Sequence, residues 1–256
     1  MNYLAGKALD RRHDYLVCST HRSGSSLLCE LLRGTGSAGL PREHIMRLRP
    51  RGGAFDGVTD QGILELLPPL SHSSLPPDID LVALAREKAT DPNGIFATKL
   101  MWPTFTALRE RLGLQSGPEL LRLLTPSLLC VHIIRPDKTA QAVSYWAALQ
   151  SGSWVAGQPS QREPVYHFRA IDHLRRLLEE QEACWSKLFS DAGVTPLIVV
   201  YDELVADLPG TVRGVLRYVG VDSDDVEIPP PALRRQAGAR SSEWIDRYRS
   251  DRKVCL

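Results

Sequence analysis

The segment THRSGSS, residues 20–26, combines residue types that bind anions. Its glycine allows close backbone approach, its serines offer hydroxyl donors, and its arginine offers a forked, charged contact. The segment lies between the apolar run YLVCS (15–19) and the amphipathic run SSLLCELLRGTG (25–36). A strand that leads through a short loop into a helix also presents free backbone N–H groups and the positive end of a helix dipole. The loop therefore predicts a phosphate-like anion site, or else a capped helix start without a ligand. The candidate anion-binding residues are Arg22, Ser23, Gly24, Ser25 and Ser26.

Two later segments contain further residues that could bind an anion. In HIIRPDKTAQAVSYW (132–146), Arg135 follows an apolar run and Ser144 lies about two helical turns further on. Both can converge on one phosphate at the carboxyl edge of a parallel sheet, or they can simply meet solvent. In RRQAGARSSEWIDRYR (234–249), Arg240 and Ser241 precede a predicted helix, where Ser241 or Ser242 could equally be its N-cap. A ligand with two separated phosphate-like groups would contact all three segments.

Better-known nucleotide and nucleophile motifs do not fit the chain. The loop lacks the lysine and the spacing of a Walker P-loop. A tyrosine-phosphatase-type loop would need an arginine six residues after Cys18, where this chain has Gly24. No GxSxG elbow is present. The run GTGSAG (34–39) matches GxGxxG, but it follows a predicted helix and runs into a proline, which is the wrong context for a dinucleotide fold.

The elements that must position these residues alternate between strands and helices. Continuous apolar runs predict strands, and apolar residues at helical spacing predict helices. Strands are expected at 15–19, 94–102, 128–134 and 196–205, and helices at 25–36, 137–150, 166–189, 208–221 and 241–251. This order is typical of an α/β protein with a central parallel sheet flanked by helices. Asp137 is a predicted N-cap, and the Pro-, Ser- and Gly-rich stretches 49–57 and 66–80 are predicted loops. We expect one domain over 1–256, with 1–13 flexible.

Composition excludes several classes of protein. The chain is 43% hydrophobic and 24% charged, and its 31 basic and 30 acidic residues leave a net charge of +1, which argues against a nucleic-acid partner. The sequence has no segment typical of a signal peptide and no apolar run of about 18 residues. We therefore expect neither a secreted nor a membrane-spanning protein. Five cysteines without a CxxC pair favour a reducing cytoplasm over a disulfide framework. The seven histidines show no metal-binding spacing, and a homo-oligomer is left open.

Several motifs occur together in the order found in one known family. RSGSSLL, PREH, KLMW, RPD followed by QAVSYW, and RQAGARSSEWIDRYR resemble the bacterial trehalose 2-sulfotransferase-like family of sulfotransferases. This family uses 3′-phosphoadenosine 5′-phosphosulfate (PAPS), and the resemblance covers residues 15–248. It implies the P-loop-like sulfotransferase fold, with residues 22–26 around the 5′-phosphosulfate and no metal. It implies that Arg135 and Ser144 bind the 3′-phosphate with help from Arg240 and Ser241. Arg22 or Lys99 would replace the loop lysine of animal cytosolic sulfotransferases.

The resemblance also implies a catalytic base. Glu43, in GLPREHIM, aligns with the carboxylate that the trehalose-type enzymes use to take the proton of the acceptor hydroxyl. Without the resemblance, Glu43 would be interpreted as a surface residue in a turn. Leu40 stands where trehalose-sulfating members carry a second acid, so a less polar acceptor is also compatible. His44 and Trp102 either line the acceptor pocket or are an ordinary loop histidine and core tryptophan.

The expected function is PAPS-dependent O-sulfotransfer. The acceptor would be a hydroxyl of a sugar, a glycolipid, or a glycosylated or other secondary metabolite. One alternative is an ATP-dependent small-molecule kinase, which would need Mg²⁺ and the loop lysine that this chain lacks. Another is a non-catalytic nucleotide-binding protein.

Overall fold

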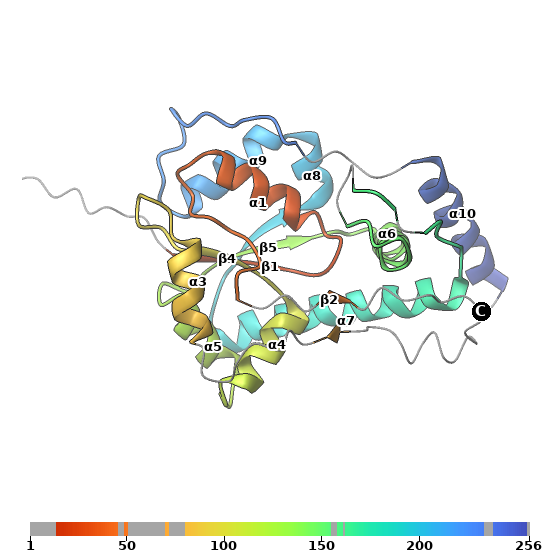
Figure 1. Cartoon of the computed structure of the whole chain (residues 1–256), viewed down its shortest axis with the longest axis horizontal. Coiled ribbons are helices and arrows are strands. Elements are labelled where there is room, and N and C mark those ends of the chain that lie inside the picture. Colours follow the sequence, from red (N-terminus) through yellow and green to blue (C-terminus); the bar gives the residue numbers. More distant parts are fainter. Residues whose placement is uncertain are drawn as a thin grey trace, which may run out of the picture.

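A four-stranded parallel sheet forms the centre of the protein (Figure 1). The strand order is β4-β1-β5-β6, and Tyr15 of β1 lies opposite Ala97 of β4 and Leu129 of β5. This computed structural model describes residues 14–45, 49–50, 70–71, 80–154, 158–160, 162–232 and 238–254. The strands of the central sheet are β1 (Tyr15–Ser19), β4 (Ala97–Met101), β5 (Leu129–Ile134) and β6 (Leu197–Val200). The predicted α/β architecture with a central parallel sheet is therefore confirmed.

Helices cover both faces of this sheet (Figure 1). On one face lie α1 (Ser25–Gly34), α8 (Tyr201–Ala206) and α9 (Leu208–Tyr218). On the other face lie α3 (Leu81–Ala89), α4 (Trp102–Arg111), α5 (Gly117–Leu124) and one end of α7 (Phe168–Ala192). Successive β1 residues point to opposite faces: Tyr15 and Val17 join the α1 side, whereas Leu16 and Cys18 join the α7 side. All five β1 residues are consequently buried.

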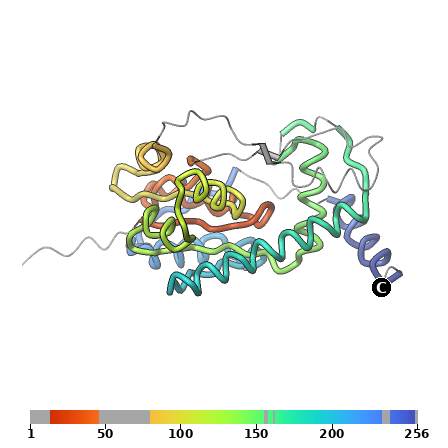
Figure 2. Tube along the Cα trace, turned by 90° about the horizontal axis from the view of Figure 1, so that it is seen from below, coloured from red at the N-terminus to blue at the C-terminus, as the bar shows by residue number. Residues whose placement is uncertain are grey.

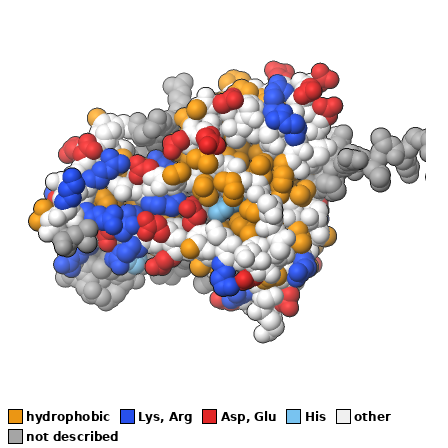
Figure 3. Space-filling model, turned by 180° about the vertical axis from the view of Figure 1, so that it is seen from behind, with side chains coloured by type: hydrophobic (Ala, Val, Ile, Leu, Met, Phe, Trp, Pro, Cys, Tyr) orange, Lys and Arg blue, Asp and Glu red, His pale blue; other side chains and the backbone are white. Residues whose placement is uncertain are grey.

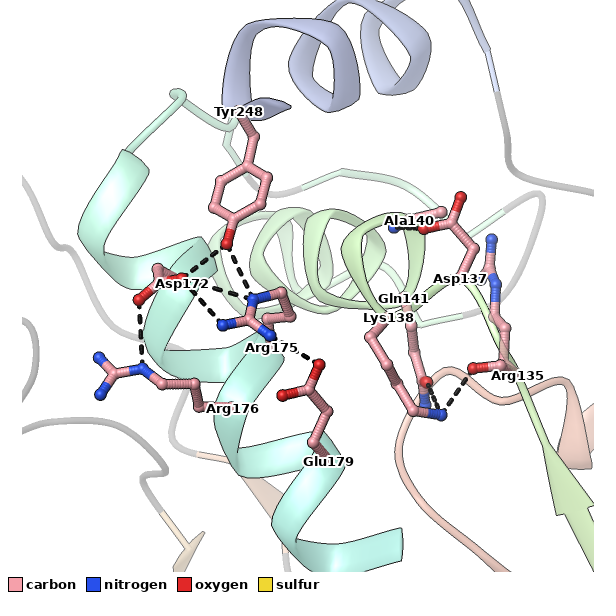
Figure 4. Close-up of polar contacts among 10 residues, drawn as sticks. All are labelled: Arg135, Asp137, Lys138, Ala140, Gln141, Asp172, Arg175, Arg176, Glu179 and Tyr248. Atoms are coloured by element: carbon pink, nitrogen blue, oxygen red, sulfur yellow. Dashed lines mark hydrogen bonds and ion pairs between the residues drawn. The ribbon is translucent and has the colours of Figure 1, made fainter. Parts of the chain in front are cut away.

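The long helix α7 continues past the sheet and packs there against α6 (Lys138–Ser151) and α10 (Ala239–Val254) (Figure 2). Trp146, Leu174 and Trp244 belong to this third apolar cluster. A polar network joins α10 to α7 (Figure 4). The Tyr248 hydroxyl donates to Asp172 Oδ1 at 2.6 Å and accepts from Arg175 Nε at 2.9 Å. This outer bundle thus extends the molecule beyond the carboxyl ends of the strands.

Most of the predicted strands and helices occur in the structure, but two interpretations are wrong and three helices were not predicted. The strand over 196–205 was predicted too long, because β6 ends at Val200 and α8 begins at Tyr201. Asp202 and Glu203 lie in the first turn of α8, where the helix dipole favours negative charge. The N-cap interpretation of Ser241 and Ser242 is also wrong, because α10 already begins at Ala239. Helices α3, α4 and α5 were not predicted.

Two expected loops fall largely outside the described residues. Within 49–57 and 66–80, the structure describes only the short antiparallel pair β2 (Arg49–Pro50) and β3 (Leu70–Ser71), followed by Asp80. Asp80 Oδ1 accepts from the first backbone N–H groups of α3 and caps that helix. Residues 1–13 also lie outside the described part of the chain.

The described part of the chain has neither a membrane-spanning helix nor a cluster of metal-binding side chains. None of the helices there has the length and apolar character needed to cross a membrane. The same part of the chain contains no group of three or more His, Cys, Asp and Glu side chains placed to hold a metal ion. Cys18, Cys29 and Cys130 are buried free thiols, and Cys184 is an exposed one.

The network between α7 and α10 generates a stability prediction. Replacing Tyr248→Phe removes two hydrogen bonds to charged groups and should lower the free energy of unfolding by about 1.5–3 kcal/mol, measured by urea denaturation at pH 7. Burial tends to raise the pKa of Asp172, but the Tyr248 hydrogen bond and two neighbouring arginines outweigh it and lower this pKa. The contribution is therefore present above the unfolded pKa of Asp172 and is lost as the pH falls through the folded one.

A matched control is Tyr218→Phe, because the Tyr218 hydroxyl makes only long contacts, of 3.3 and 3.4 Å, with backbone groups. Its effect should be smaller and independent of pH. A Tyr248→Phe loss that stays constant from pH 7 to the acid limit of folding would contradict the network as described.

Candidate active site

The loop after β1 has the backbone of an anion-binding turn. Arg22 and Gly24 both adopt positive φ, at 62° and 95°. A Cβ atom on Gly24 would lie 2.4 Å from Cδ2 of Tyr201, so both the backbone conformation and the packing require glycine. The first residue of α8 thus forms one wall of the loop.

Helix α6 holds the loop from the other side through one buried amide. Gln141 Nε2 donates to Thr20 Oγ1 at 2.9 Å and to the carbonyl of His21 at 2.6 Å. Gln141 is itself oriented by Lys138, whose ammonium group donates to Gln141 Oε1 at 3.3 Å and pairs with Glu182 of α7 at 2.7 Å. Figure 4 shows Lys138 beside Gln141 and the carbonyl of Arg135. A series of polar contacts, from Glu182 of α7 through Lys138 to Gln141, therefore positions the loop.

Three of the predicted anion-binding residues meet at this place. Arg22 Nε donates to Ser144 Oγ at 3.0 Å, and Arg135 Nη1 donates to the carbonyl of Arg22 at 3.3 Å. The Arg135 guanidinium lies over the Tyr201 ring, 4.6 Å from its centroid. A second nitrogen of Arg22 donates to the carbonyl of Trp154. The loop arginine and the strand-end arginine are thus neighbours, as the convergence at the carboxyl edge of the sheet requires.

The electrostatics of this group suit an anionic ligand. Burial, and after it the nearby positive charge of Arg135, lower the pKa of Arg22 to about 10. Arg22 remains a cation at neutral pH, so two guanidinium groups share a partly buried place. Ser23 is fully buried, and its Oγ atom has no hydrogen-bond partner among the described residues. An orphaned buried hydroxyl beside two like charges is costly, and a bound phosphate or sulfate group would relieve both costs.

A second cluster joins the loop to the predicted base. Lys99 Nζ lies 2.8 Å from Glu43 Oε1 and 3.2 Å from Ser26 Oγ. The Lys99 side chain is only 6% exposed and that of Glu43 is 26% exposed. The backbone N–H of Lys99 and the Thr98 hydroxyl both donate to the carbonyl of Arg42, at 2.9 and 3.0 Å. These bonds lay the segment around Glu43 against β4, so the carboxylate comes to lie beside the loop.

The other predicted site residues lie elsewhere or make different contacts. Arg240 is exposed and pairs with Glu163, and the N–H of Ser241 donates to the carbonyl of Gly238 at 2.9 Å. Figure 3 shows Lys and Arg side chains gathered at the end of the molecule that carries α10, with Asp and Glu side chains among them. These contacts of Arg240 and Ser241 therefore do not join them to Arg22 or Arg135. Their part in binding a phosphate stays a prediction.

The two candidate pocket residues have ordinary structural contacts. Trp102 packs 5.7 Å from the ring of Phe105 and edge-on at 5.1 Å from Trp185, within the apolar cluster on the α7 side of the sheet. His44 Nε2 is 2.9 Å from the carbonyl of Leu40 and closes the turn that carries Glu43. These contacts agree with the interpretation of a core tryptophan and a loop histidine.

Sequence reasoning missed the residues that support the loop. Trp185 Nε1 donates to the carbonyl of Ser19 at 3.0 Å, where β1 ends. Gln141 and Tyr201 were likewise not singled out, although Gln141 holds the loop backbone and Tyr201 packs against Gly24. A polar residue among the apolar positions of AQAV was the one available signal for Gln141. Trp185 and Tyr201 gave no signal, because their partners lie far away in the sequence.

Comparisons with known proteins identify the family of this chain. The family model described as Stf0 sulphotransferase matches residues 14–251. A trehalose 2-sulfotransferase of Mycobacterium tuberculosis (strain ATCC 35801 / TMC 107 / Erdman) is 39% identical over 257 residues, covering 93% of this chain and 94% of the relative. A trehalose 2-sulfotransferase of Mycolicibacterium smegmatis (strain ATCC 700084 / mc(2)155) is 38% identical over 261 residues, with the same coverage. The resemblance found in the sequence is thereby confirmed, and the chain belongs to the Stf0 sulphotransferase family, a family of sulfuryl-transferring enzymes.

Proposed function

We propose that this enzyme transfers a sulfuryl group from PAPS to a hydroxyl group of a carbohydrate. Sulfuryl transfer follows from the family, and the carbohydrate acceptor is supported by the two relatives named for trehalose. The single observation that carries the proposal is the position of Lys99, whose ammonium group contacts both Glu43 and Ser26. One buried cation thus joins a carboxylate suited to proton transfer with a loop suited to anion binding.

The residues of the loop fit PAPS as the donor. PAPS supplies an activated sulfuryl group and carries two separated anionic groups. Residues 22–26 would hold the 5′-phosphosulfate, and Arg135 with Ser144 would hold the 3′-phosphate. Arg22 bridges the two groups, because it belongs to the loop and donates to Ser144. Arg240 and Ser241 would join the 3′-phosphate site only by leaving the contacts described above.

Glu43 acts as the base in this proposal. The oxygen of the acceptor hydroxyl forms a bond to sulfur while the bond between sulfur and the 5′-phosphate oxygen breaks. Glu43 takes the proton of the hydroxyl, and adenosine 3′,5′-bisphosphate is the leaving group. Lys99 orients the carboxylate through the 2.8 Å ion pair and adds positive charge beside the loop. Arg22, Arg135 and Lys99 together supply the charge neutralisation, so the mechanism uses no metal ion. Positioning and electrostatics dominate here, as in phosphoryl transfer.

Domain organisation and location extend the same proposal. The family model spans 14–251, which supports one sulfotransferase domain over the chain. The free thiols of the four described cysteines support a reducing cytoplasm. The kinase and the non-catalytic alternative are both disfavoured by the family match and by the absence of a loop lysine.

A ligand titration tests the donor. Adenosine 3′,5′-bisphosphate at about one hundred times its Kd should stabilise the folded protein by about 2.7 kcal/mol, because it binds the native state alone. The measurement is the melting temperature with the bisphosphate, and with ATP and Mg²⁺ in a parallel series. Stabilisation by ATP with Mg²⁺ but not by the bisphosphate would contradict PAPS as the donor.

A carboxylate substitution tests the base. Glu43→Gln keeps the shape of the side chain but removes its ability to take a proton, so the transfer rate should fall by about 10²–10⁴-fold while bisphosphate binding is kept. The control is Glu87→Gln on the exposed surface of α3, which should leave the transfer rate unchanged. Weakened bisphosphate binding with intact turnover in Glu43→Gln would remove Glu43 as the base.

An arginine substitution tests the 3′-phosphate site. Arg135→Ala removes a charged donor and should weaken bisphosphate binding by about 1.5–3 kcal/mol, measured by titration calorimetry. Arg122→Ala, on the exposed face of α5, is the matched control and should bind the bisphosphate like the unmodified protein. Unchanged binding in Arg135→Ala would place the 3′-phosphate elsewhere.

A further inference from the structure

His21 is a buried polar side chain of the loop to which the proposed reaction gives no part. Its imidazole is 9% exposed and stacks on the ring of Tyr145, with centroids 4.8 Å apart and an interplanar angle of 6°. The ring of Trp154 lies on the same side, 6.5 Å away and tilted by 57°. The Nδ1 atom of His21 is buried and has no hydrogen-bond partner in the part of the chain that the structure describes. An apolar ring would fill this place equally well, so packing alone does not explain an imidazole here.

The orphaned nitrogen makes an imidazole costly at this position. A buried polar atom without a partner loses its hydrogen bond to water and gains nothing in the protein. Native proteins satisfy the great majority of such atoms. Those that remain unsatisfied need an explanation, for example a ligand. A ligand that bears a hydroxyl group could supply the missing hydrogen bond.

The charge state of His21 restricts the kind of ligand. Burial lowers the pKa of His21 to about 4. The negative charge of Glu43 opposes this shift, whereas the positive charges of Lys99 and Arg22 act in the same direction. The imidazole is therefore neutral at neutral pH. A neutral ring has no charge to offer a phosphate, but it can exchange a hydrogen bond with a hydroxyl group.

The surroundings of His21 place it at the acceptor end of the site. The charged groups that act on its ring include both members of the Glu43–Lys99 pair, so the ring lies near the proposed base. Its backbone is held by Gln141, which leaves the ring as the part of the residue that is free to bind. The stack on Tyr145 fixes the plane of the ring. An acceptor sugar ring that approaches Glu43 meets the edge of the fixed, neutral imidazole of His21.

We propose that His21 binds the acceptor by hydrogen-bonding a sugar hydroxyl through its imidazole and thereby helps to select a polyhydroxylated substrate. The inference rests on the proposed function, because it requires that the acceptor approach Glu43. It assigns to His21 no proton transfer and no contact with the donor phosphates. Tyr145 and Trp154 act through His21 by holding its ring.

The test compares His21→Phe, His21→Asn and His21→Gln in the full-length protein. Phe keeps the stacked ring and removes both nitrogens, whereas Asn and Gln place an amide near the positions of Nδ1 and Nε2. Trehalose serves as the probe acceptor with PAPS as the donor. His21→Phe should raise the KM for trehalose by about twofold to twelvefold, the usual effect of losing one neutral hydrogen bond. One of the two amide variants should return the KM close to that of the unmodified protein and clearly below that of His21→Phe.

The binding of adenosine 3′,5′-bisphosphate is the internal control. All three variants should bind it within about twofold of the unmodified protein, since the ring does not touch the donor. A fivefold or greater loss of this binding would assign His21 to the donor site and overturn the inference. A trehalose KM that is unchanged in His21→Phe, or raised by the same factor in all three variants, would also overturn it.

The failure of the proposed function would look different. If the unmodified protein binds the bisphosphate but does not sulfate trehalose, the carbohydrate acceptor is wrong, and the sugar-binding part of His21 falls with it. If the unmodified protein sulfates trehalose and the His21 variants match it, only the inference about His21 is wrong. Should His21→Phe fail to fold, the difference in KM between the Asn and Gln variants still decides the question.

Discussion

The ammonium group of Lys99 is the contact on which the candidate site depends. It arises from β4, a central-sheet strand, and it reaches both Glu43 and Ser26. Ser26 belongs to α1, and Glu43 lies in the segment that follows this helix; Arg33 of α1 also joins the two by donating to the carbonyl of Pro41 at 3.0 Å. The carbonyl of Arg42, which accepts from the backbone of the same lysine, brings the base to the same strand. A rigid parallel strand therefore sets the distance between the base and the donor loop, which is the quantity that matters most when catalysis rests on positioning.

Neighbouring positive charges are the second constraint. Arg22 and Arg135 share a partly buried place, and the pKa of Arg22 is lowered by burial and by its neighbour. Ser23 adds a buried hydroxyl that has no hydrogen-bond partner among the described residues. The protein tolerates these costs because the surroundings hold the groups in place: Tyr201 supports Arg135 from below, and Ser144 accepts from Arg22. Such a prearranged group of donors binds an anion without first reorganising, which is the basis of electrostatic catalysis.

The outer bundle explains why the loop keeps its shape. Helix α7 packs under the sheet at one end and against α6 and α10 at the other. Its Glu182 pairs with Lys138, which orients Gln141, which in turn holds the loop backbone. The same helix sends Trp185 to the carbonyl at the end of β1. A single long helix thus connects the core of the sheet, the outer bundle and the site, so changes in the bundle are expected to reach the loop.

The sequence by itself determined the features that rest on local pattern. Continuous apolar runs are typical of buried parallel strands, and they located the β1 strand and the sheet. The position of Asp137 directly before a helical segment indicated that it caps this helix. The resemblance of ordered motifs pointed to Glu43 and Lys99 as members of one site. Only the tertiary structure decided which side chains meet: that Arg22 turns to Ser144, that Arg240 pairs with Glu163, and that His21 stacks on Tyr145. The physical reason is that these contacts join residues far apart in the chain, whereas propensity and periodicity report only on neighbours. For the same reason Tyr201 looked like strand in its apolar run, although it begins a helix beside Gly24.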